Sequence, residues 1–379
     1  MNNSSQVARG MMSITSSGLV SPVGYDVAAL ECSRVVTHQA PTHLGTESLP
    51  PRPMWAASDL PVERFLGRKG VSHLDRTTKL GLIAAHLAFA DFAEDSSETF
   101  RRRTGVVMGT STGSIRNTSE FSRETLVQDR PYLVNPRLFP SSVMNCCAGQ
   151  IAIRNSLRGV NATVAGGQLS MIHALRYAMN AIRCGHVDRL LVGAVEELSA
   201  QSAWAWHRTR GLADEAAVGE GCGVFMVERT VDIAEANRPP LISILSCEVG
   251  TYDPLTNRDG LASGVGECIR RALIQAGVAA NEITTVAIGA THQRALSDVE
   301  LDGIRRGLGG IPPTVVEIKR TVGECFSANG AMQIAALLGG VAPVGPSSDL
   351  CLVTSVGYDG TAGCLVLQRF GPPLHDSKG

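Results

Sequence analysis

The chain is poor in aromatic side chains, in net charge and in long apolar runs. Aromatic residues make up 4% of its 379 residues, and the formal net charge is −1 at pH 7. A near-neutral balance provides no electrostatic attraction to nucleic acid or to an anionic membrane surface, so we expect neither as a partner. No uninterrupted apolar run is long enough to span a bilayer, and the polar N-terminus does not resemble a signal peptide. We therefore expect a cytoplasmic protein.

Paired cysteine motifs are also missing. The 10 cysteines include no Cys-x-x-Cys pair and are spread through apolar segments. This distribution favours small buried thiols over disulfides or metal ligands. We expect no metal site and no cofactor.

The residues that are abundant indicate a layered α/β protein. Hydrophobic residues make up 44% of the chain and there are 40 glycines, a composition that suits helices packed closely against a sheet. We expect residues 1–10 to be a disordered lead-in and 33–60 to be mostly loop. Expected strands start at Met12 and cover 104–108, 161–165, 190–193, 223–228, 241–250, 285–288, 314–317, 350–355 and 363–368. Expected helices cover 75–92, 264–277, 298–307 and 327–339. Because strands and helices alternate twice over, two similar halves are predicted, 11–240 and 241–370.

One segment of the first half has the geometry of a nucleophile site without a nucleophile. Residues 161–175 read as a β-branched strand that turns through two glycines into an amphipathic helix, with Gln168 at the turn. Backbone N–H groups and the dipole at a helix N-terminus favour developing negative charge, so this geometry suits an exposed nucleophile. A glutamine cannot carry an acyl group as a thioester. The sequence therefore keeps the architecture of a catalyst and lacks its reactive group.

An ordered series of short motifs runs through nearly the whole chain. They are Ser21-Pro-Val-Gly24, Leu74-Asp-Arg76, Pro140-Ser-Ser-Val-Met-Asn145, Ala148-Gly149, Leu157-Arg-Gly159, Gly219-Glu-Gly-Cys-Gly223, Lys319 with Gly323, and Gly357-Tyr-Asp-Gly-Thr361. In this order the motifs resemble those of β-ketoacyl synthases of the thiolase fold, from about residue 12 to 369. The resemblance implies an αβαβα layered fold with two pseudo-duplicated halves in one closely packed unit.

The resemblance also assigns the family's catalytic positions. A gapless run from Pro140 places the family's cysteine at Gln168. The first histidine position falls on Ala290 and the second, directly after Gly323, falls on Glu324, whereas the family's lysine is retained as Lys319. All three groups that form the thioester and drive decarboxylation are thus replaced together.

Two kinds of relative differ in what they retain. Some ketosynthase-like decarboxylases replace only the cysteine and keep both histidines, which stabilise the enolate that forms as carbon dioxide leaves. The chain length factors of type II polyketide synthases lack the histidines as well, and this chain fits their pattern. The implied role is a non-catalytic subunit that pairs with an active ketosynthase, serves an acyl carrier protein and shapes the shared acyl tunnel. The alternatives are a malonyl decarboxylase or acyltransferase with an atypical site, and a pure scaffold.

The same resemblance suggests where the tunnel and the partner lie. In chain length factors a helix after a glycine turn carries bulky residues that plug the tunnel, and matching Gly113 to that turn puts them at Ile115, Thr118 and Ser122. A slip of one residue brings in Phe121, and an ordinary helix face is the alternative. The small Ser122 predicts a deeper tunnel and an elongated, reduced polyene product. The predicted interface residues lie before and along the strand that precedes Gln168: Met144, Cys146, Val164, Ala165 and Gly166.

Two residues are open to more than one interpretation. Gln168 is either a simple polar helix start or a buried amide that fills the former pocket and supports the partner. Cys325 is either a displaced nucleophile or a packing residue, and packing is favoured because a thiolate beside the carboxylate of Glu324 is unfavourable.

Overall fold

The computed structural model describes residues 11–30, 41–45, 48–57, 60–92, 97–236, 238–310, 314–340 and 349–370. The predictions for residues 1–10 and for Cys32 lie outside these ranges, and those for the loop at 33–60 lie partly outside them.

Ten of the twelve described strands form one sheet whose two ends repeat the same pattern, and β2 and β6 pair separately. Its order is β10-β9-β11-β12-β8-β1-β7-β5-β3-β4. The first half contributes β1 (Met12–Val20), β3 (Thr104–Thr110), β4 (Asn161–Ala165), β5 (Arg189–Glu196) and β7 (Gly221–Arg229). The second contributes β8 (Ile242–Thr251), β9 (Ile283–Ala287), β10 (Thr314–Val316), β11 (Asp349–Val356) and β12 (Thr361–Arg369). Taken in chain order, each half therefore arranges its strands as third, second, fourth, fifth, first, and parallel and antiparallel pairings also match.

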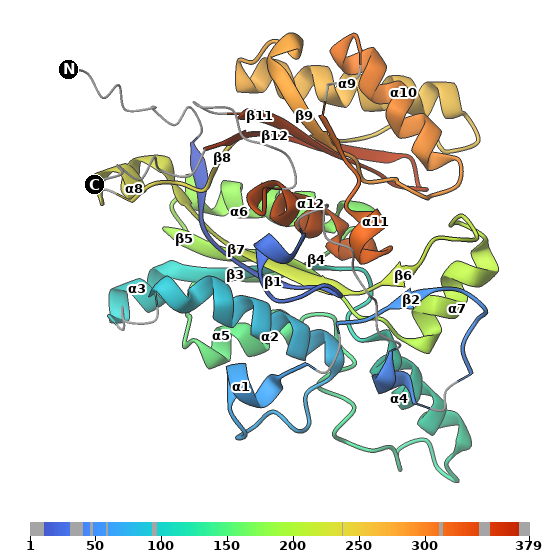
Figure 1. The fold of residues 1–379 in the computed structure, drawn as a ribbon. Helices are drawn as coiled ribbons and strands as arrows, with labels where there is room; N and C mark the ends of the chain where they lie inside the picture. Colours follow the sequence, from blue (N-terminus) through green and yellow to red (C-terminus); the bar gives the residue numbers. More distant parts are fainter. Residues whose placement is uncertain are drawn as a thin grey trace, which may run out of the picture.

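The halves meet where their first strands pair. β1 and β8 run antiparallel over only three residue pairs, Met12–Ile14 against Ile242–Ile244. Because this seam is short, the two parts of the sheet can diverge beyond it, and Figure 1 shows them lying above one another as separate layers. Two helices fill the space between the layers, α6 (Ser170–Arg183) from the first half and α12 (Asn329–Leu338) from the second.

Outer helices cover the remaining faces of the sheet. α2 (Arg76–Phe89) and α5 (Cys146–Arg154) lie under the first half, and α9 (Arg258–Ala276) and α10 (Leu296–Leu308) lie over the second. The result is the five-layered αβαβα arrangement of the thiolase-like fold, so the predicted fold class is confirmed (Figure 1). The division into domains 11–240 and 241–370 stays a prediction.

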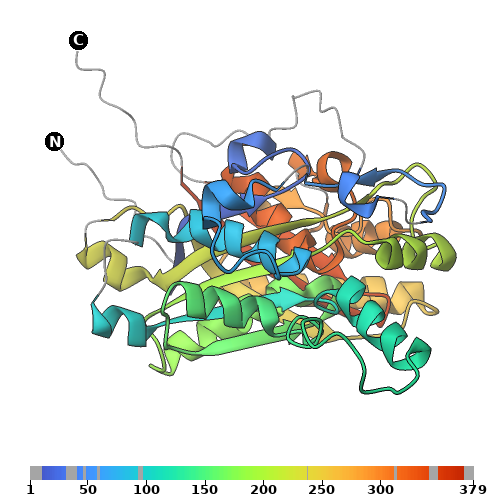
Figure 2. The ribbon, with the colours of Figure 1, turned by 90° about the horizontal axis from the view of Figure 1, so that it is seen from below.

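A lobe at one end carries part of the site described below. It contains β2 (Met54–Trp55), β6 (Val218–Gly219), α4 (Ile115–Val127) and α7 (Ala200–Thr209), at the lower right of Figure 1 and the right of Figure 2. The other described short elements are α1 (Val62–Leu66), α3 (Glu98–Arg103), α8 (Thr230–Glu235), α11 (Lys319–Val322), and the 3-10 turns Val27–Leu30, Thr42–Leu44, Ala90–Phe92, Gly167–Leu169, Ala280–Glu282 and Phe326–Ala328. No helix in the described ranges is both long and apolar enough to cross a membrane.

Local side chains explain where several helices begin. Asp75 caps α2 by accepting a hydrogen bond from the Thr78 N–H, and Ser114 caps α4 in the same way. α9 starts at Arg258, six residues before its predicted start at 264, because Asn257 supplies the cap. The sequence pattern hid this first turn because Arg258, Asp259 and Gly260 have no apolar signal. A Cβ at Gly264 would lie 2.3 Å from the ring of Tyr252, so this glycine permits close packing.

The apolar interior consists of separate clusters, which lie between neighbouring layers of the fold. The largest cluster surrounds α6 and α12 and draws residues from both halves of the chain. Separate clusters lie between the sheet and α2 with α5, and between the sheet and α9 with α10. Of the described cysteines, Cys184 is exposed, Cys146 is half-buried and the rest are buried. None of the described cysteines forms a disulfide. The predicted small buried thiols are thus confirmed for seven of them.

The close approach of β1 to α2 provides a test of this packing. A Cβ on Gly18 would lie 2.0 Å from the carbonyl oxygen of Ala84, which is helix backbone and cannot move alone. We expect Gly18→Ala to lower the free energy of unfolding by about 2 kcal/mol or more, measured by chemical denaturation. Gly149→Ala on α5 is the matched control, because nothing lies within 4 Å of its added methyl. Equal stability of the two variants would contradict the packing described here.

Candidate functional site

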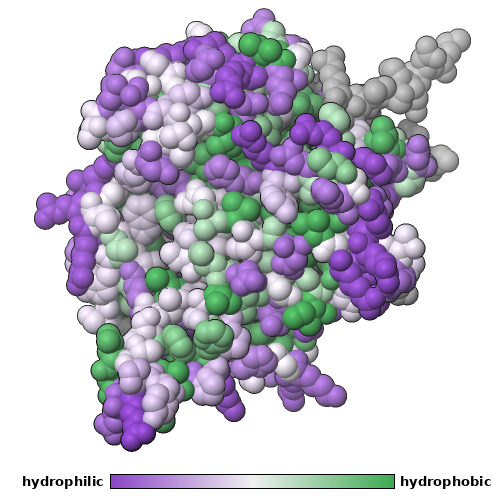
Figure 3. All heavy atoms as spheres, turned by 180° about the vertical axis from the view of Figure 1, so that it is seen from behind, coloured by the Kyte–Doolittle hydropathy of each residue, from purple (hydrophilic) through white to green (hydrophobic). Residues whose placement is uncertain are grey.

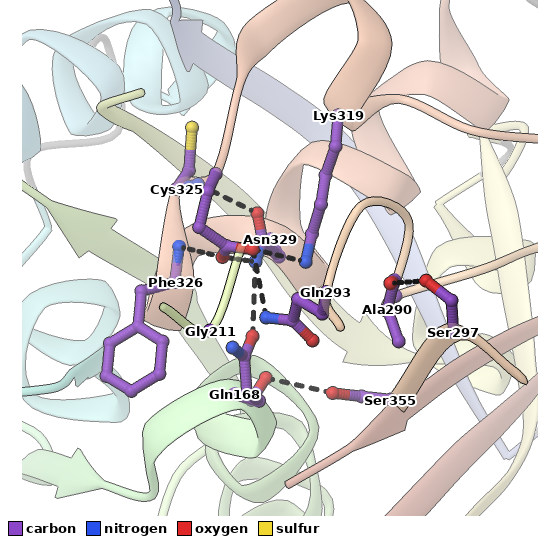
Figure 4. A network of polar contacts seen from close by, with 12 residues as sticks. Gln168, Gly211, Ala290, Gln293, Ser297, Lys319, Cys325, Phe326, Asn329 and Ser355 are labelled. Carbon is purple, nitrogen blue, oxygen red and sulfur yellow. Dashed lines mark hydrogen bonds and ion pairs between the residues drawn. The ribbon is translucent and has the colours of Figure 1, made fainter. Parts of the chain in front are cut away.

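Gln168 lies at the junction between β4 and α6, in the middle of the molecule. Gly167, with φ of 54°, turns the chain from the strand into a short 3-10 turn that continues as α6. The Gln168 side chain is buried, and its backbone carbonyl accepts a hydrogen bond from the Ser355 hydroxyl at 3.1 Å. Its side-chain Oε1 accepts one from Asn329 Nδ2 at 3.2 Å (Figure 4). The side-chain Nε2 has no hydrogen-bond partner in the described part of the chain.

The carboxylate of Glu324 is the centre of the polar network around Gln168. Lys319 Nζ lies 2.6 Å from Glu324 Oε2, and both side chains are only 2% exposed. Gln293 Nε2 donates to the same oxygen at 2.9 Å. The other oxygen, Oε1, accepts hydrogen bonds from Asn329 Nδ2 and, at 2.8 Å, from the backbone N–H of Phe326. The Glu324 carboxyl is therefore held by a buried cation and by three neutral donors.

Ala290 occupies the remaining predicted catalytic position and is fully buried. Its backbone N–H donates to Glu300 Oε2 at 2.6 Å, and its carbonyl accepts from the Ser297 hydroxyl at 2.5 Å (Figure 4). The structure therefore places Gln168, Ala290, Lys319 and Glu324 in one buried region, as the resemblance implies. The methyl of Ala290 can neither donate a proton nor stabilise an anion.

Cys325 is the thiol next to this network, and its environment disfavours reaction. It is fully buried, and burial first, then the charges of Glu324 and Glu220, raise the pKa of its thiol well above the usual range. A thiol that stays protonated is a poor nucleophile. Phe326 follows with a φ of 42°, an unusual value for a residue with a side chain. Its ring packs edge-on against Trp206 with centroids 5.5 Å apart.

A cavity of about 580 Å³ adjoins this network on the side of the lobe. Trp206, Phe326 and Tyr358 form an aromatic wall, and Glu324 reaches it from the network just described. Two further acidic residues, Glu196 and Glu197, line it from the end of β5, and both are buried.

Both of these carboxyl groups titrate far from their ordinary range. Burial raises the pKa of Glu196 to about 7, although the hydroxyls of Ser111 and Ser327 donate hydrogen bonds to it. Burial likewise raises the pKa of Glu197 to about 7, against a hydrogen bond from the Arg116 backbone N–H. Buried carboxyl groups are easier to accommodate when protonated, which explains both shifts.

The structure separates the residues predicted to plug a tunnel. Ile115 lines the cavity, at the start of α4. Thr118 and Phe121 instead contact the segment before α5: the Thr118 hydroxyl lies 3.3 Å from the Ser142 carbonyl oxygen, and the Phe121 ring lies 5.9 Å from that of Phe139. Ser122 is exposed. A role for these four residues in a tunnel stays a prediction.

The predicted interface residues lie at or near an open sheet edge. β4 is the last strand of the sheet, and Val164 and Gly166 are half-buried while Ala165 is exposed. Met144 is 48% exposed, and Cys146 is half-buried. The β4 edge lies toward the rear in Figure 1, and Figure 3 shows apolar and weakly polar side chains across the middle of the rear face, with hydrophilic ones around the rim. Their role at an interface stays a prediction.

The layered fold is that of the thiolase-like ketosynthase class. The N-terminal domain family of β-ketoacyl synthases matches residues 62–232. The solved structure titled "The ishigamide ketosynthase/chain length factor" is 32% identical, with a TM-score of 0.80, and the match covers 96% of this chain and 100% of that one. The chain therefore belongs to the β-ketoacyl synthase family.

More distant relatives agree with this assignment. The 3-oxoacyl-[acyl-carrier-protein] synthase 2 of Vibrio cholerae serotype O1 is 22% identical over 348 residues, or 84% of this chain and 83% of the relative. A structure of a type II polyketide synthase acyl-carrier protein in complex with its ketosynthase bound to the hexaketide is 17% identical, with a TM-score of 0.76. At that identity the second likeness shows the fold alone.

Several residues of the site had not been predicted from the sequence. Asn329 and Gln293 hold the side chains of Gln168 and Glu324, and neither belongs to a motif that identified the family. Glu196 and Glu197 could have been found, because two consecutive carboxylates directly after an apolar strand are unusual. Trp206 lines the cavity as well.

The buried ion pair leads to a stability prediction. Lys319→Met leaves the carboxylate of Glu324 buried without its cation, so we expect the free energy of unfolding to fall by about 3–5 kcal/mol in chemical denaturation. Adding Glu324→Gln to Lys319→Met removes the unpaired charge and should recover a large part of that loss. A double variant no more stable than Lys319→Met would show that the ion pair does not hold this region together.

Proposed function

We propose that this chain is the non-catalytic chain length factor of a type II polyketide synthase. It would pair with an active ketosynthase and form part of the tunnel that receives the growing chain from an acyl carrier protein. The observation that carries the proposal is the polar network in which Glu324, fully satisfied by Lys319, Gln293 and Asn329, stands where the family has a histidine.

This network argues against the proposed alternative of a decarboxylase. Loss of carbon dioxide from a malonyl thioester leaves an enolate, which needs positioned hydrogen-bond donors. At the two histidine positions the chain offers the methyl of Ala290 and the carboxylate of Glu324, and a carboxylate repels an enolate. Gln168 cannot form a thioester. A silent subunit is therefore better supported than an enzyme with an atypical site.

The sheet edge at β4 supports a partner subunit. An unpaired edge strand presents backbone donors and acceptors that another strand can satisfy. Between the end of α4 and the end of α5, in the segment that leads toward β4, large apolar side chains are exposed: Tyr132, Leu133, Phe139, Val143, Met144 and Ile153. α4 has no buried residue, although it has an amphipathic sequence, which suits a helix covered in a complex. Two of the similar structures bear titles that name a ketosynthase with a chain length factor or with an acyl-carrier protein.

The direct test is reconstitution with a ketosynthase from the same pathway and its acyl carrier protein. We expect condensation only when both subunits are present, with the acyl group on the partner's cysteine as detected by mass spectrometry. Gln168→Ala in this chain should leave the activity of the pair within about twofold, because Gln168 does no chemistry. Acylation or decarboxylation by this chain alone, abolished by Gln168→Ala, would instead establish an enzyme.

The interface can be tested with a matched pair of substitutions. Met144→Asp places a charge next to the β4 edge and should weaken binding of the ketosynthase at least tenfold, measured by calorimetry. Ile274→Asp is the control, since Ile274 is 80% exposed on α9 of the other half. If both variants bind the partner like the wild type, the partner does not cover this face.

The tunnel role of α4 makes a separate prediction. Ser122→Phe adds bulk on the exposed face of α4, and we expect the reconstituted pair to release shorter chains. Glu120→Phe is the control, because two positions along a helix turn the side chain by about 200° to the opposite side. Product lengths measured by mass spectrometry that do not change with Ser122→Phe would favour the pure scaffold.

A further inference from the structure

The cavity beside the polar network of Glu324 combines a mostly apolar wall with a group of carboxyls. Its lining residues Thr112, Ala205 and Thr209 are exposed, whereas Glu196, Glu197 and Glu324 are buried. The cavity therefore runs from the surface to a group of carboxyls. About 580 Å³ is ample for a small organic molecule.

The charge-bearing side chains of this wall are all carboxylic: Glu196, Glu197 and Glu324. Among the described residues that line it there is no Lys, Arg or His. The Oε1 atom of Gln201 is buried and accepts no hydrogen bond from any described residue. Gly211 contributes a carbonyl oxygen, which accepts from the Tyr358 hydroxyl at 2.8 Å. Hydrogen-bond donors on a ligand would satisfy the carboxyls and the Gln201 oxygen, and further acceptors would not.

The apolar part of the wall is aromatic. Trp206 packs edge-on against Phe326 and lies with its centroid 6.5 Å from that of Tyr358. Aromatic faces attract organic cations and also accommodate alkyl groups. Carboxyl groups and aromatic rings around one space form a combination that recognises ammonium ions.

Charge distinguishes the possible ligands. An anion such as a carboxylate would face Glu196 and Glu197 with no cation on the wall to offset the repulsion, since Lys319 is already paired with Glu324. A neutral apolar molecule would fill the space and leave the Gln201 acceptor unsatisfied. An ammonium group carries a positive charge, which the carboxyls attract, and three donors, which can satisfy acceptors such as the Gln201 oxygen.

We propose that this cavity binds an organic ammonium ion, with its nitrogen at Glu196 and Glu197 and its apolar body against Trp206, Phe326 and Tyr358. This is a ligand site in addition to the partner and tunnel roles above, and it does not depend on them. The carboxyl of Glu196 can accept a further donor because Ser111 and Ser327 occupy only one lone pair on each oxygen.

Binding by this site should strengthen as the pH rises through about 7, where both carboxyls ionise. An alkylammonium remains charged over this range. The ionisable groups that face the two carboxyls from neighbouring elements are acidic or paired: Asp75 at the start of α2, Cys325, and Glu324 with Lys319. The Arg116 guanidinium, on α4, donates to the His43 carbonyl oxygen at 3.2 Å.

The test is calorimetric titration of the full chain with n-hexylammonium, hexanol and hexanoate at pH 8. We expect n-hexylammonium to bind at least tenfold more tightly than hexanol, and hexanoate to bind more weakly than hexanol. Lowering the pH to 5.5 should weaken n-hexylammonium at least fivefold and leave hexanol unchanged.

Substitutions locate the site. Glu196→Gln keeps the shape and the hydrogen bonds with both serines, and should weaken n-hexylammonium at least fivefold without affecting hexanol. Glu98→Gln, on an exposed carboxylate of α3, is the matched control and should change nothing. Thermal unfolding of each variant checks its fold, and Glu197→Gln replaces Glu196→Gln if the latter does not fold. Absence of n-hexylammonium binding, equal binding of n-hexylammonium and hexanol, tightest binding of hexanoate, or an unchanged Glu196→Gln would each overturn the proposal.

Discussion

The buried pair of Lys319 and Glu324 is the interaction on which the centre of this molecule depends. Two opposite charges 2.6 Å apart, almost without solvent, must satisfy each other or be removed together. Once Glu324 is fixed, the backbone N–H of Phe326 and the side chain of Asn329 are fixed by it, and Asn329 in turn holds Gln168. The region around Gln168 is therefore filled by buried side chains that hold one another in place.

The rest of the site follows from this rigidity. Phe326 leaves the network with a backbone conformation that turns its ring toward Trp206, and these two rings form one wall of the cavity. The residues that pack around Gln168 and Glu324 therefore also shape the neighbouring cavity. Glu196 connects the two, because the Ser327 hydroxyl just beyond Phe326 donates to its carboxyl. A substitution of Glu324 would therefore alter the cavity even if a ligand in the cavity did not contact Glu324.

Most of the fold could be predicted from the sequence, and much of the site could not. Short apolar and β-branched runs located the strands, apolar residues at helical spacing located several long helices, and the glycine turn before Gln168 located the junction of β4 and α6. The start of α9 was missed because Arg258, Asp259 and Gly260 carry no apolar signal. Gln293 and Asn329 were missed because their importance comes from residues distant in sequence, which no local pattern records. The separation of Ile115 from Ser122 likewise needed the path of the segment before α5.

The middle layer of the structure has a consequence for how the chain folds. α6 comes from the first half and α12 from the second, and both are buried in one apolar cluster shared by the two halves. Either half in isolation would expose the surface that the other half's helix covers, while the seam between β1 and β8 contributes only three residue pairs. Unfolding should therefore be cooperative across the whole chain, without a stable half-folded intermediate. The duplicated architecture has in this way become indivisible, so that neither half can be lost or exchanged independently.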